Sequence, residues 1–152
     1  MADLNTATRT KVAQIAGQKT TAGSFNPVRK LFIDTPAVWS GANGDTAGTG
    51  IVLPMGARIS AEVIISSAVG TASTTLSVGL RNNATKVASD ATAYVTNASI
   101  ATAQTQSVVT GTKTTGGQFY TVPEESEVFL TFGGATPLAN QAIRIELEFV
   151  SP

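Results

Sequence analysis

The fold is decided by the stretch from Ile51 to Leu80, IVLPMGARISAEVIISSAVGTASTTLSVGL, in which apolar and polar residues alternate along two runs. In the first run the apolar side chains share one face of an extended chain, namely Ile59, Ala61, Val63 and Ile65. After a break that contains Gly70, the alternation resumes with Leu76, Val78 and Leu80. The two runs predict a β-hairpin whose apolar faces merge into one surface, which the rest of the chain must cover.

Composition limits the chemistry open to this chain. The 152 residues are 42% hydrophobic, enough for one core, but only 13% are charged, against about 25% in a typical protein. The ten basic and ten acidic residues balance, so neither nucleic acid nor a membrane is an expected partner. Cysteine and histidine are absent, which removes disulfides, thiolate sites and histidine-based triads. We therefore expect no enzyme, no metal, no cofactor and no small-molecule substrate, and an assembled rather than solitary protein.

The first residues differ from those that follow. They contain no apolar core of the length that a secretory signal requires, and no later window is apolar enough to span a membrane, so we expect a soluble product made in the cytoplasm. Residues 1–27 carry a basic excess and few apolar side chains, which favours an extended N-terminal arm over a short helix at residues 7–16. The folded domain is expected to span residues 28–152.

The remaining sequence contains six further strand candidates, which bring the total to about eight: Val28–Asp34, Ala91–Val95, Gln104–Thr112, Gln118–Val122, Glu127–Phe132 and Ala142–Val150. Residues 40–50 (SGANGDTAGTG) and 81–89 are expected to be loops. In Glu127–Phe132 the residues Val128, Leu130 and Phe132 should face inward, and Glu127, Phe129 and Thr131 outward. With no helix between strands, the pattern predicts an all-β antiparallel sandwich or a jelly-roll barrel.

Four groups of residues have a chemical interpretation that we weighed against a structural one. Trp39 beside a glycine-rich loop has the chemistry to stack on a sugar or base, but a tryptophan that caps one end of the core is favoured. The glutamates of the turn PEESE have the chemistry of a calcium site, but a solvated acidic turn is favoured; they are Glu124, Glu125 and Glu127. Gly17, Lys19 and Thr20 lack the strand and spaced glycines of a phosphate loop. Asp34, Asp45 and Asp90 are scattered, so they do not predict a glycosidase pair.

Three segments resemble a known family: LPMGARISAEVIIS, STTLSVGL and SEVFLTFGGATPLANQAIRIELEFV. The residues that carry the resemblance are Leu53, Pro54, Gly56, Ala57, Thr75 to Gly79, Ala135, Pro137, Ala139 and Ile143 to Glu146. They are similar to the small β-rich decoration, or cement, proteins of tailed bacteriophage capsids, over roughly residues 50–150. The resemblance implies a jelly-roll-like β-sandwich, commonly a homotrimer, that sits on the capsid exterior of the virion and clamps neighbouring major capsid protein subunits.

Charge distribution suggests how such a protein would be held. Five basic residues and one acidic residue lie at or before Lys30, whereas five basic and nine acidic residues follow it. The candidate capsid-binding residues are therefore Arg9, Lys11, Lys19, Arg29 and Lys30. We expect the basic arm to order along an acidic groove of the capsid lattice, the alternative being a solvated tail. Alternative functions are a phage fibre or receptor-binding domain, with recognition loops around Trp39 and Asn83, and a carbohydrate-binding module.

Overall fold

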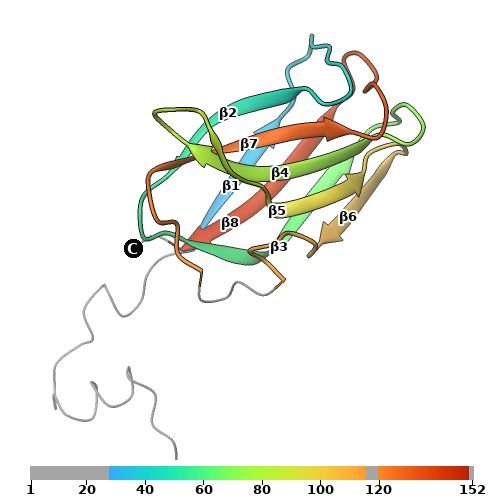
Figure 1. Ribbon diagram of the computed structural model, residues 1–152. Coiled ribbons are helices and arrows are strands. Elements are labelled where there is room, and N and C mark those ends of the chain that lie inside the picture. Colours follow the sequence, from blue (N-terminus) through green and yellow to red (C-terminus); the bar gives the residue numbers. More distant parts are fainter. Residues whose placement is uncertain (1–27, 116–119, 151–152) are drawn as a thin grey trace, which may run out of the picture.

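The computed structural model describes residues 28–115 and 120–150, and every regular element within them is a β-strand. The strands are β1 (Val28–Asp34), β2 (Thr46–Leu53), β3 (Arg58–Ser67), β4 (Thr75–Asn82), β5 (Ala88–Ser99), β6 (Gln104–Val108), β7 (Ser126–Gly133) and β8 (Ile143–Val150). They form two stacked antiparallel sheets (Figure 1), sheet A with the order β1-β8-β3-β6 and sheet B with the order β2-β7-β4-β5. The predicted all-β sandwich is confirmed. The predicted arm, residues 1–27, lies outside the described residues.

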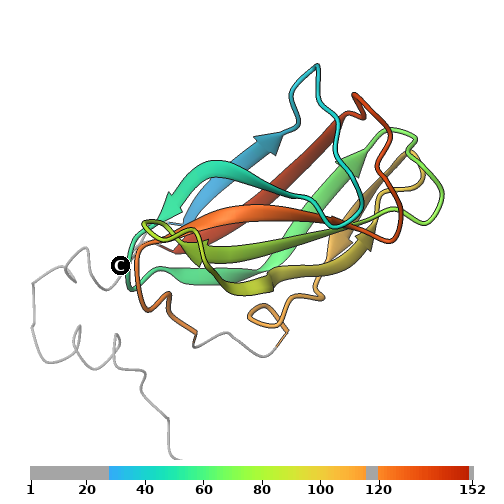
Figure 2. The same cartoon turned by 45° about the horizontal axis from the view of Figure 1, so that its top comes forward.

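The strand order shows how the chain wraps around its core. The first strand pairs with the eighth, the second with the seventh, the third with the sixth and the fourth with the fifth. The chain is thus one long antiparallel hairpin that winds up, so that β8 also meets β3 and β7 also meets β4. Figure 2 shows the two sheets layered over each other. This arrangement is jelly-roll-like.

The predicted hairpin between the third and fourth strands is wrong. β3 lies in sheet A between β8 and β6, whereas β4 lies in sheet B between β7 and β5. Alternation identifies the buried face of a strand but not the strand beside it, so the pairing did not follow from the pattern. The two apolar faces therefore do not merge into one surface: Val63 and Ile65 of β3 lie in one sheet, Leu76 and Val78 of β4 lie in the other, and the two faces share one core between the sheets.

The set of eight strands also differs from the prediction at two places. β2 begins at Thr46, inside the expected loop of residues 40–50. Its glycines and threonines disguise it, and it bulges between Gly48 and Val52 with Gly50 at φ +71°. Conversely, the expected strand Gln118–Val122 is reduced, in its described part, to one bridge between Thr121 and Arg58; residues 118 and 119 lie outside the described residues. The predicted number was right only because these two errors cancel.

One end of the sandwich is tied together by Gln141, which is buried just before β8. Its Nε2 donates hydrogen bonds to the carbonyl oxygens of Ala68 (2.9 Å) and Ile100 (2.7 Å). The backbone carbonyl oxygen of Gln141 accepts from Trp39 Nε1 at 2.8 Å and from Thr35 Oγ1 at 2.9 Å. Four connections that are distant in the sequence therefore meet at this one side chain and its backbone, and buried backbone groups there find partners.

Part of the outer face of sheet B is buried, around Phe129 of β7, which was predicted to point outward. Phe129 does point outward, yet only 3% of it is exposed. It lies in register between Gly48 on β2 and Gly79 on β4, and the Arg81 guanidinium lies 5.5 Å from its ring centroid. Gly48 leaves room for the side chains of Arg81 and Glu127, and a bulge of β5 passes over Gly79. Small residues here let backbone approach the sheet closely.

Gly79→Ala tests this close approach. A Cβ at residue 79 would lie 2.5 Å from the backbone atoms of Asp90 and Ala91, so β5 must shift. We expect the free energy of unfolding to fall by about 3 kcal/mol, measured by urea denaturation. The control is Gly41→Ala, whose added Cβ would meet its nearest neighbours at an ordinary 3.7 Å. Equal losses of stability in the two variants would contradict the close packing of the β5 bulge over Gly79.

Candidate interaction surfaces

The outer face of sheet A carries paired charges. Asp34 of β1 accepts two hydrogen bonds from the Arg144 guanidinium of β8, at 2.7 and 2.9 Å. Lys30 Nζ lies 2.8 Å from a carboxylate oxygen of Glu146. Each pair joins adjacent antiparallel strands, where side chains on one face lie about 5 Å apart. The negative charges of Glu62 and Glu148 also raise the pKa of Lys30, so acidic groups outnumber basic ones around this lysine.

These charges have a structural rather than a catalytic character. The hydrogen bond to Glu146, chiefly, raises the pKa of Lys30, and the hydrogen bond from Arg144 lowers the pKa of Asp34. Both shifts move the groups further from titration at neutral pH, whereas a general acid or base needs a pKa near the working pH. Among the described residues no group of three or more carboxylates could hold a metal ion.

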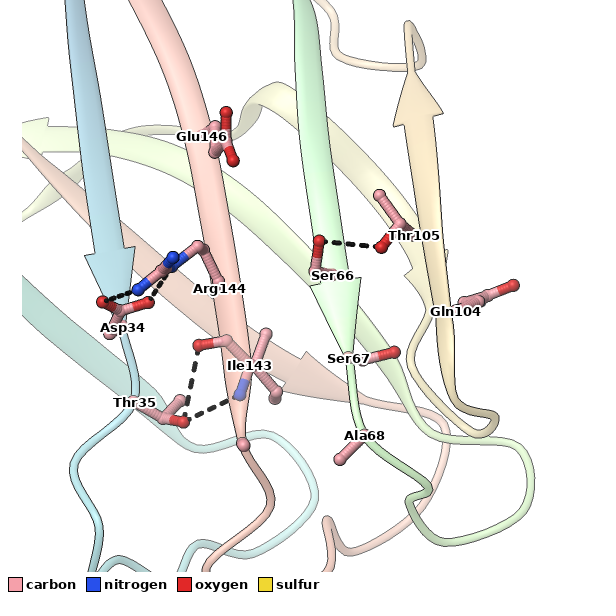
Figure 3. A pocket seen from close by; sticks show the side chains of 11 residues that line it. Asp34, Thr35, Ser66, Ser67, Ala68, Gln104, Thr105, Ile143, Arg144 and Glu146 are labelled. Atoms are coloured by element: carbon pink, nitrogen blue, oxygen red, sulfur yellow. Dashed lines mark hydrogen bonds and ion pairs between the residues drawn. The ribbon is translucent and has the colours of Figure 1, made fainter.

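A shallow polar depression of about 760 Å³ lies on this face beside the ends of β1, β3, β6 and β8. Figure 3 shows its two sides, with Asp34 and Arg144 bonded to each other on one and Ser66 facing Thr105 on the other. The oxygens of Ser66 and Thr105 are 3.0 Å apart. The polar side chains that define the depression thus largely satisfy one another. It offers hydrogen-bonding groups to a flat polar partner and no enclosed site for a small molecule.

The structure places two of the five predicted capsid-binding residues. Arg29 and Lys30 lie on β1, where both are exposed. Lys30 is engaged with Glu146 and lies 5.8 Å from the ring centroid of Phe32. The other three predicted residues, Arg9, Lys11 and Lys19, lie outside the described residues, as do Gly17 and Thr20 of the rejected phosphate loop.

The acidic turn before β7 is solvated only in part, because Glu125 is exposed, as predicted, whereas Glu127 is buried. Only 4% of Glu127 is exposed, and its carboxylate accepts hydrogen bonds from Arg81, Lys86 and the backbone N–H of Gly50, at 2.8 to 3.1 Å. Glu124 and Glu125 accept from the side-chain amides of Asn82 and Asn83, each at 2.6 Å. The three glutamates therefore hold the β4–β5 connection and the β2 bulge in place.

A second groove, of about 570 Å³, lies between the edge strands β1 and β2 where the two sheets separate. Its walls are mainly apolar, with Ile33, Ile51 and Phe132 among them and Phe32 also lining it. Trp39 lies in this groove but is half-buried and stacks on Phe132 with ring centroids 5.1 Å apart. The predicted role of Trp39 as a cap on the core accounts for these contacts.

The three aspartates weighed as a glycosidase pair each have a separate structural partner. Asp34 binds Arg144, Asp45 accepts from the Ala42 N–H at 2.7 Å, and Asp90 accepts from Thr92 and Thr112 in the β5 bulge. Burial alone would raise the pKa of Asp90, but the hydrogen bonds from Thr112 and Thr92 and the charge of Lys113 outweigh it and lower the pKa. The pKa values of Asp34 and Asp90 are thus lowered, whereas a general acid of a glycosidase needs a raised pKa.

Comparisons with known proteins agree on the fold. A chain of the capsid asymmetric unit of cyanophage Pam1 superposes with a TM-score of 0.61 and 18% sequence identity, over 100% of both chains. A chain from the capsid of Ralstonia phage GP4 gives a TM-score of 0.59 at 18% identity, over 83% of this chain and 85% of that one. No protein-family model matches the sequence, and no curated protein matches it. The chain therefore shares its fold with chains found in phage capsids.

The exposed aromatic ring of Phe32 is the feature of these surfaces that the sequence analysis missed. Phe32 is 56% exposed on the outer face of β1, between Lys30 and Asp34. The sequence did contain a signal for it, because Phe32 is an aromatic residue between charged residues on the polar face of the predicted strand Val28–Asp34.

No helix in the described part of the chain is long and apolar enough to cross a membrane.

The cluster that Glu127 forms with Arg81 and Lys86 predicts how the stability of the protein depends on pH. Hydrogen bonds from Lys86, Gly50 and Arg81 lower the pKa of Glu127 despite its burial. A lowered folded-state pKa gives stability that is present above the ordinary glutamate pKa and is lost as the pH falls through the folded-state value. Because the chain has no histidine, we expect the free energy of unfolding to be constant from about pH 6 to 8 and to decrease below about pH 4.5.

Glu127→Gln should lower the free energy of unfolding by about 2–3 kcal/mol at pH 7, because Arg81 and Lys86 lose their shared anion. The difference from the wild type should shrink as the pH falls, which urea titrations at several pH values would measure. Glu125→Gln is the control: this side chain is exposed and an amide still accepts from Asn83. A Glu127→Gln effect that does not change with pH would contradict the assigned role of the carboxylate.

Proposed function

We propose that this protein is a structural component of a bacteriophage virion that binds the outside of the capsid through major capsid protein subunits. The observation that carries the proposal is the match, over the whole of both chains, to a chain of the Pam1 capsid asymmetric unit. Sequence motifs over residues 50–150 point to the same class.

The chemistry of the described surfaces favours a binding role of this kind. The outer face of sheet A offers charges and hydroxyls over a broad, shallow area, which suits contact with a large partner. A carbohydrate-binding module has less support, because among the described aromatic residues only Phe32 is exposed. The fibre alternative placed recognition near Trp39 and Asn83, but Trp39 packs on Phe132 and Asn83 binds Glu125.

Residues 1–27 form the second part of the proposal. The basic side chains Arg9, Lys11 and Lys19 would order along acidic surface of the capsid and add to the affinity of the folded domain. A homotrimer on the particle would increase the effect by placing three arms on one assembly. This geometry converts modest contacts into stable attachment without any catalytic step.

Co-sedimentation with purified capsids that lack this protein tests the proposal. The full chain should pellet with the shells and saturate at a fixed ratio to the major capsid protein. Replacement of Arg9, Lys11 and Lys19 by glutamine should weaken binding by roughly tenfold or more and reduce its salt dependence, because the arm loses its charge.

The matched control replaces three basic residues of the folded domain that do not line the polar depression, namely Arg58, Lys86 and Lys113, by glutamine. This variant carries the same charge change but leaves the arm intact. Equal weakening by both triple variants would contradict the role of the arm. Failure of the full chain to bind the shells would contradict the proposed function itself.

A further inference from the structure

Four strand edges border the two sheets, and three of them are protected against pairing with another chain. The free edge of β5 is covered by residues 110–113, where Thr112 and Lys113 donate backbone hydrogen bonds to Thr92 and Ala93. β2 is bulged, and Gly50 turns its N–H to Glu127. β6 has only five residues. Short, bulged and covered edges are the usual means by which proteins prevent association through open sheet edges.

The remaining edge, β1, has no such protection within the described part of the chain. Its seven residues pair with β8 in unbroken register, from Val28 opposite Val150 to Asp34 opposite Arg144. The register continues to Thr35, whose N–H donates to the Ile143 carbonyl at 3.0 Å. Because hydrogen-bonded pairs alternate along an antiparallel ladder, the backbone groups of Lys30, Phe32 and Asp34 point away from β8, to the open edge.

The surroundings of this edge are apolar. Phe32 and Val28 are 56% and 59% exposed, and the apolar groove between β1 and β2 opens beside Phe32. A strand added to β1 would place alternate side chains over this groove and the others beside Phe32. Main-chain hydrogen bonds would supply affinity, and the groove would select side chains.

We propose that β1 pairs with β1 of a second copy of this chain, antiparallel, with Phe32 of both copies at the two-fold axis. The charges of the strand favour this occupant, since Arg29 and Lys30 lie near its start and Asp34 at its end. Antiparallel pairing brings each basic start to an acidic end, whereas parallel pairing would put like charges together. The contact is self-complementary, as a two-fold interface requires.

The register follows from the backbone groups at the edge. With Phe32 opposite Phe32 of the second copy, Lys30 lies opposite its Asp34, and both are positions whose N–H and carbonyl groups face the edge. The charges then alternate across the joined sheets: Arg144 and Asp34 of one copy are followed by Lys30 and Glu148 of the other. The two aromatic rings meet at the centre, and Leu31 faces Ile33 of the second copy on the inner side. This pairing does not rest on the proposed virion function.

Sedimentation equilibrium of the full-length protein at concentrations up to about 0.1 mM tests the pairing. Wild-type protein should form dimers, and Phe32→Glu should raise the dissociation constant about tenfold or more, because two carboxylates replace the aromatic pair at the axis. Val28→Glu is the matched control. Val28 lies on the same strand and the same face and is equally exposed, but beyond the paired residues.

Disulfide cross-linking then tests the register, since the chain has no cysteine of its own. Paired residues at the axis lie about 5.5 Å apart between Cα atoms, within the range that a disulfide bridges. Phe32→Cys should therefore give covalent dimers on mild oxidation. Val28→Cys should not, because the two copies of residue 28 would lie roughly 27 Å apart along the strands.

Several results would overturn the proposal. These are a wild-type monomer at every concentration, equal weakening by Phe32→Glu and Val28→Glu, or equal cross-linking at the two positions. A trimer that Phe32→Glu leaves intact would assign association to another surface. A monomer in solution whose β1 amides gain hydrogen-exchange protection only on the capsid would assign the edge to a strand of the capsid protein. Capsid binding by a monomeric variant would leave the proposed function standing.

Discussion

Mutual burial of the two sheets is the constraint on which this structure depends. Each sheet has one apolar face, and neither face has a partner until the other sheet is in place. Fully buried residues come from both sheets, among them Leu53, Leu76 and Leu80 of sheet B and Ile65, Ile145 and Leu147 of sheet A. Each such side chain contributes about 1.5–3 kcal/mol relative to exposure. Because the first strand pairs with the last, sheet A is complete only when both ends of the domain have come together. Contacts so distant in sequence are typical of slowly folding β-proteins.

The parts of the fold that the sequence predicted are those in which side-chain type alone decides the outcome. Strict alternation in β8 and in the second half of β3 identified the buried faces, and the absence of helical periodicity identified the class. β2 was missed because its stability comes from pairing with β7 and from the bonds of Thr49 and Gly50, not from an apolar pattern. The hairpin error has a related cause: the Ala68–Thr74 connection crosses between sheets, and alternation contains no information about partners.

The same distinction holds for the surfaces. Sequence composition indicated a chain without histidine or cysteine chemistry, but it did not reveal that Glu127 would be buried with two cations, because Arg81 and Lys86 are far from it in sequence. The charge of Lys30 was noted from the sequence, whereas its pairing with Glu146 follows from the β1–β8 register. Phe32 gained its meaning only when β1 was found at an edge. Position in a sheet decides whether an aromatic residue on a polar face is incidental or available for contact.

Gln141 has a consequence for how the loops of this protein can vary. The side-chain amide nitrogen of Gln141 holds the backbone after β3 and the backbone after β5, while the backbone carbonyl of Gln141 accepts from two side chains of the connection after β1. A change of length in any one of these connections would displace Gln141, and the other connections would then lose their hydrogen-bond partner in a buried site. The loops at this end are therefore expected to diverge together among related sequences, as a single inherited unit, and a graft of one loop alone would be tolerated poorly.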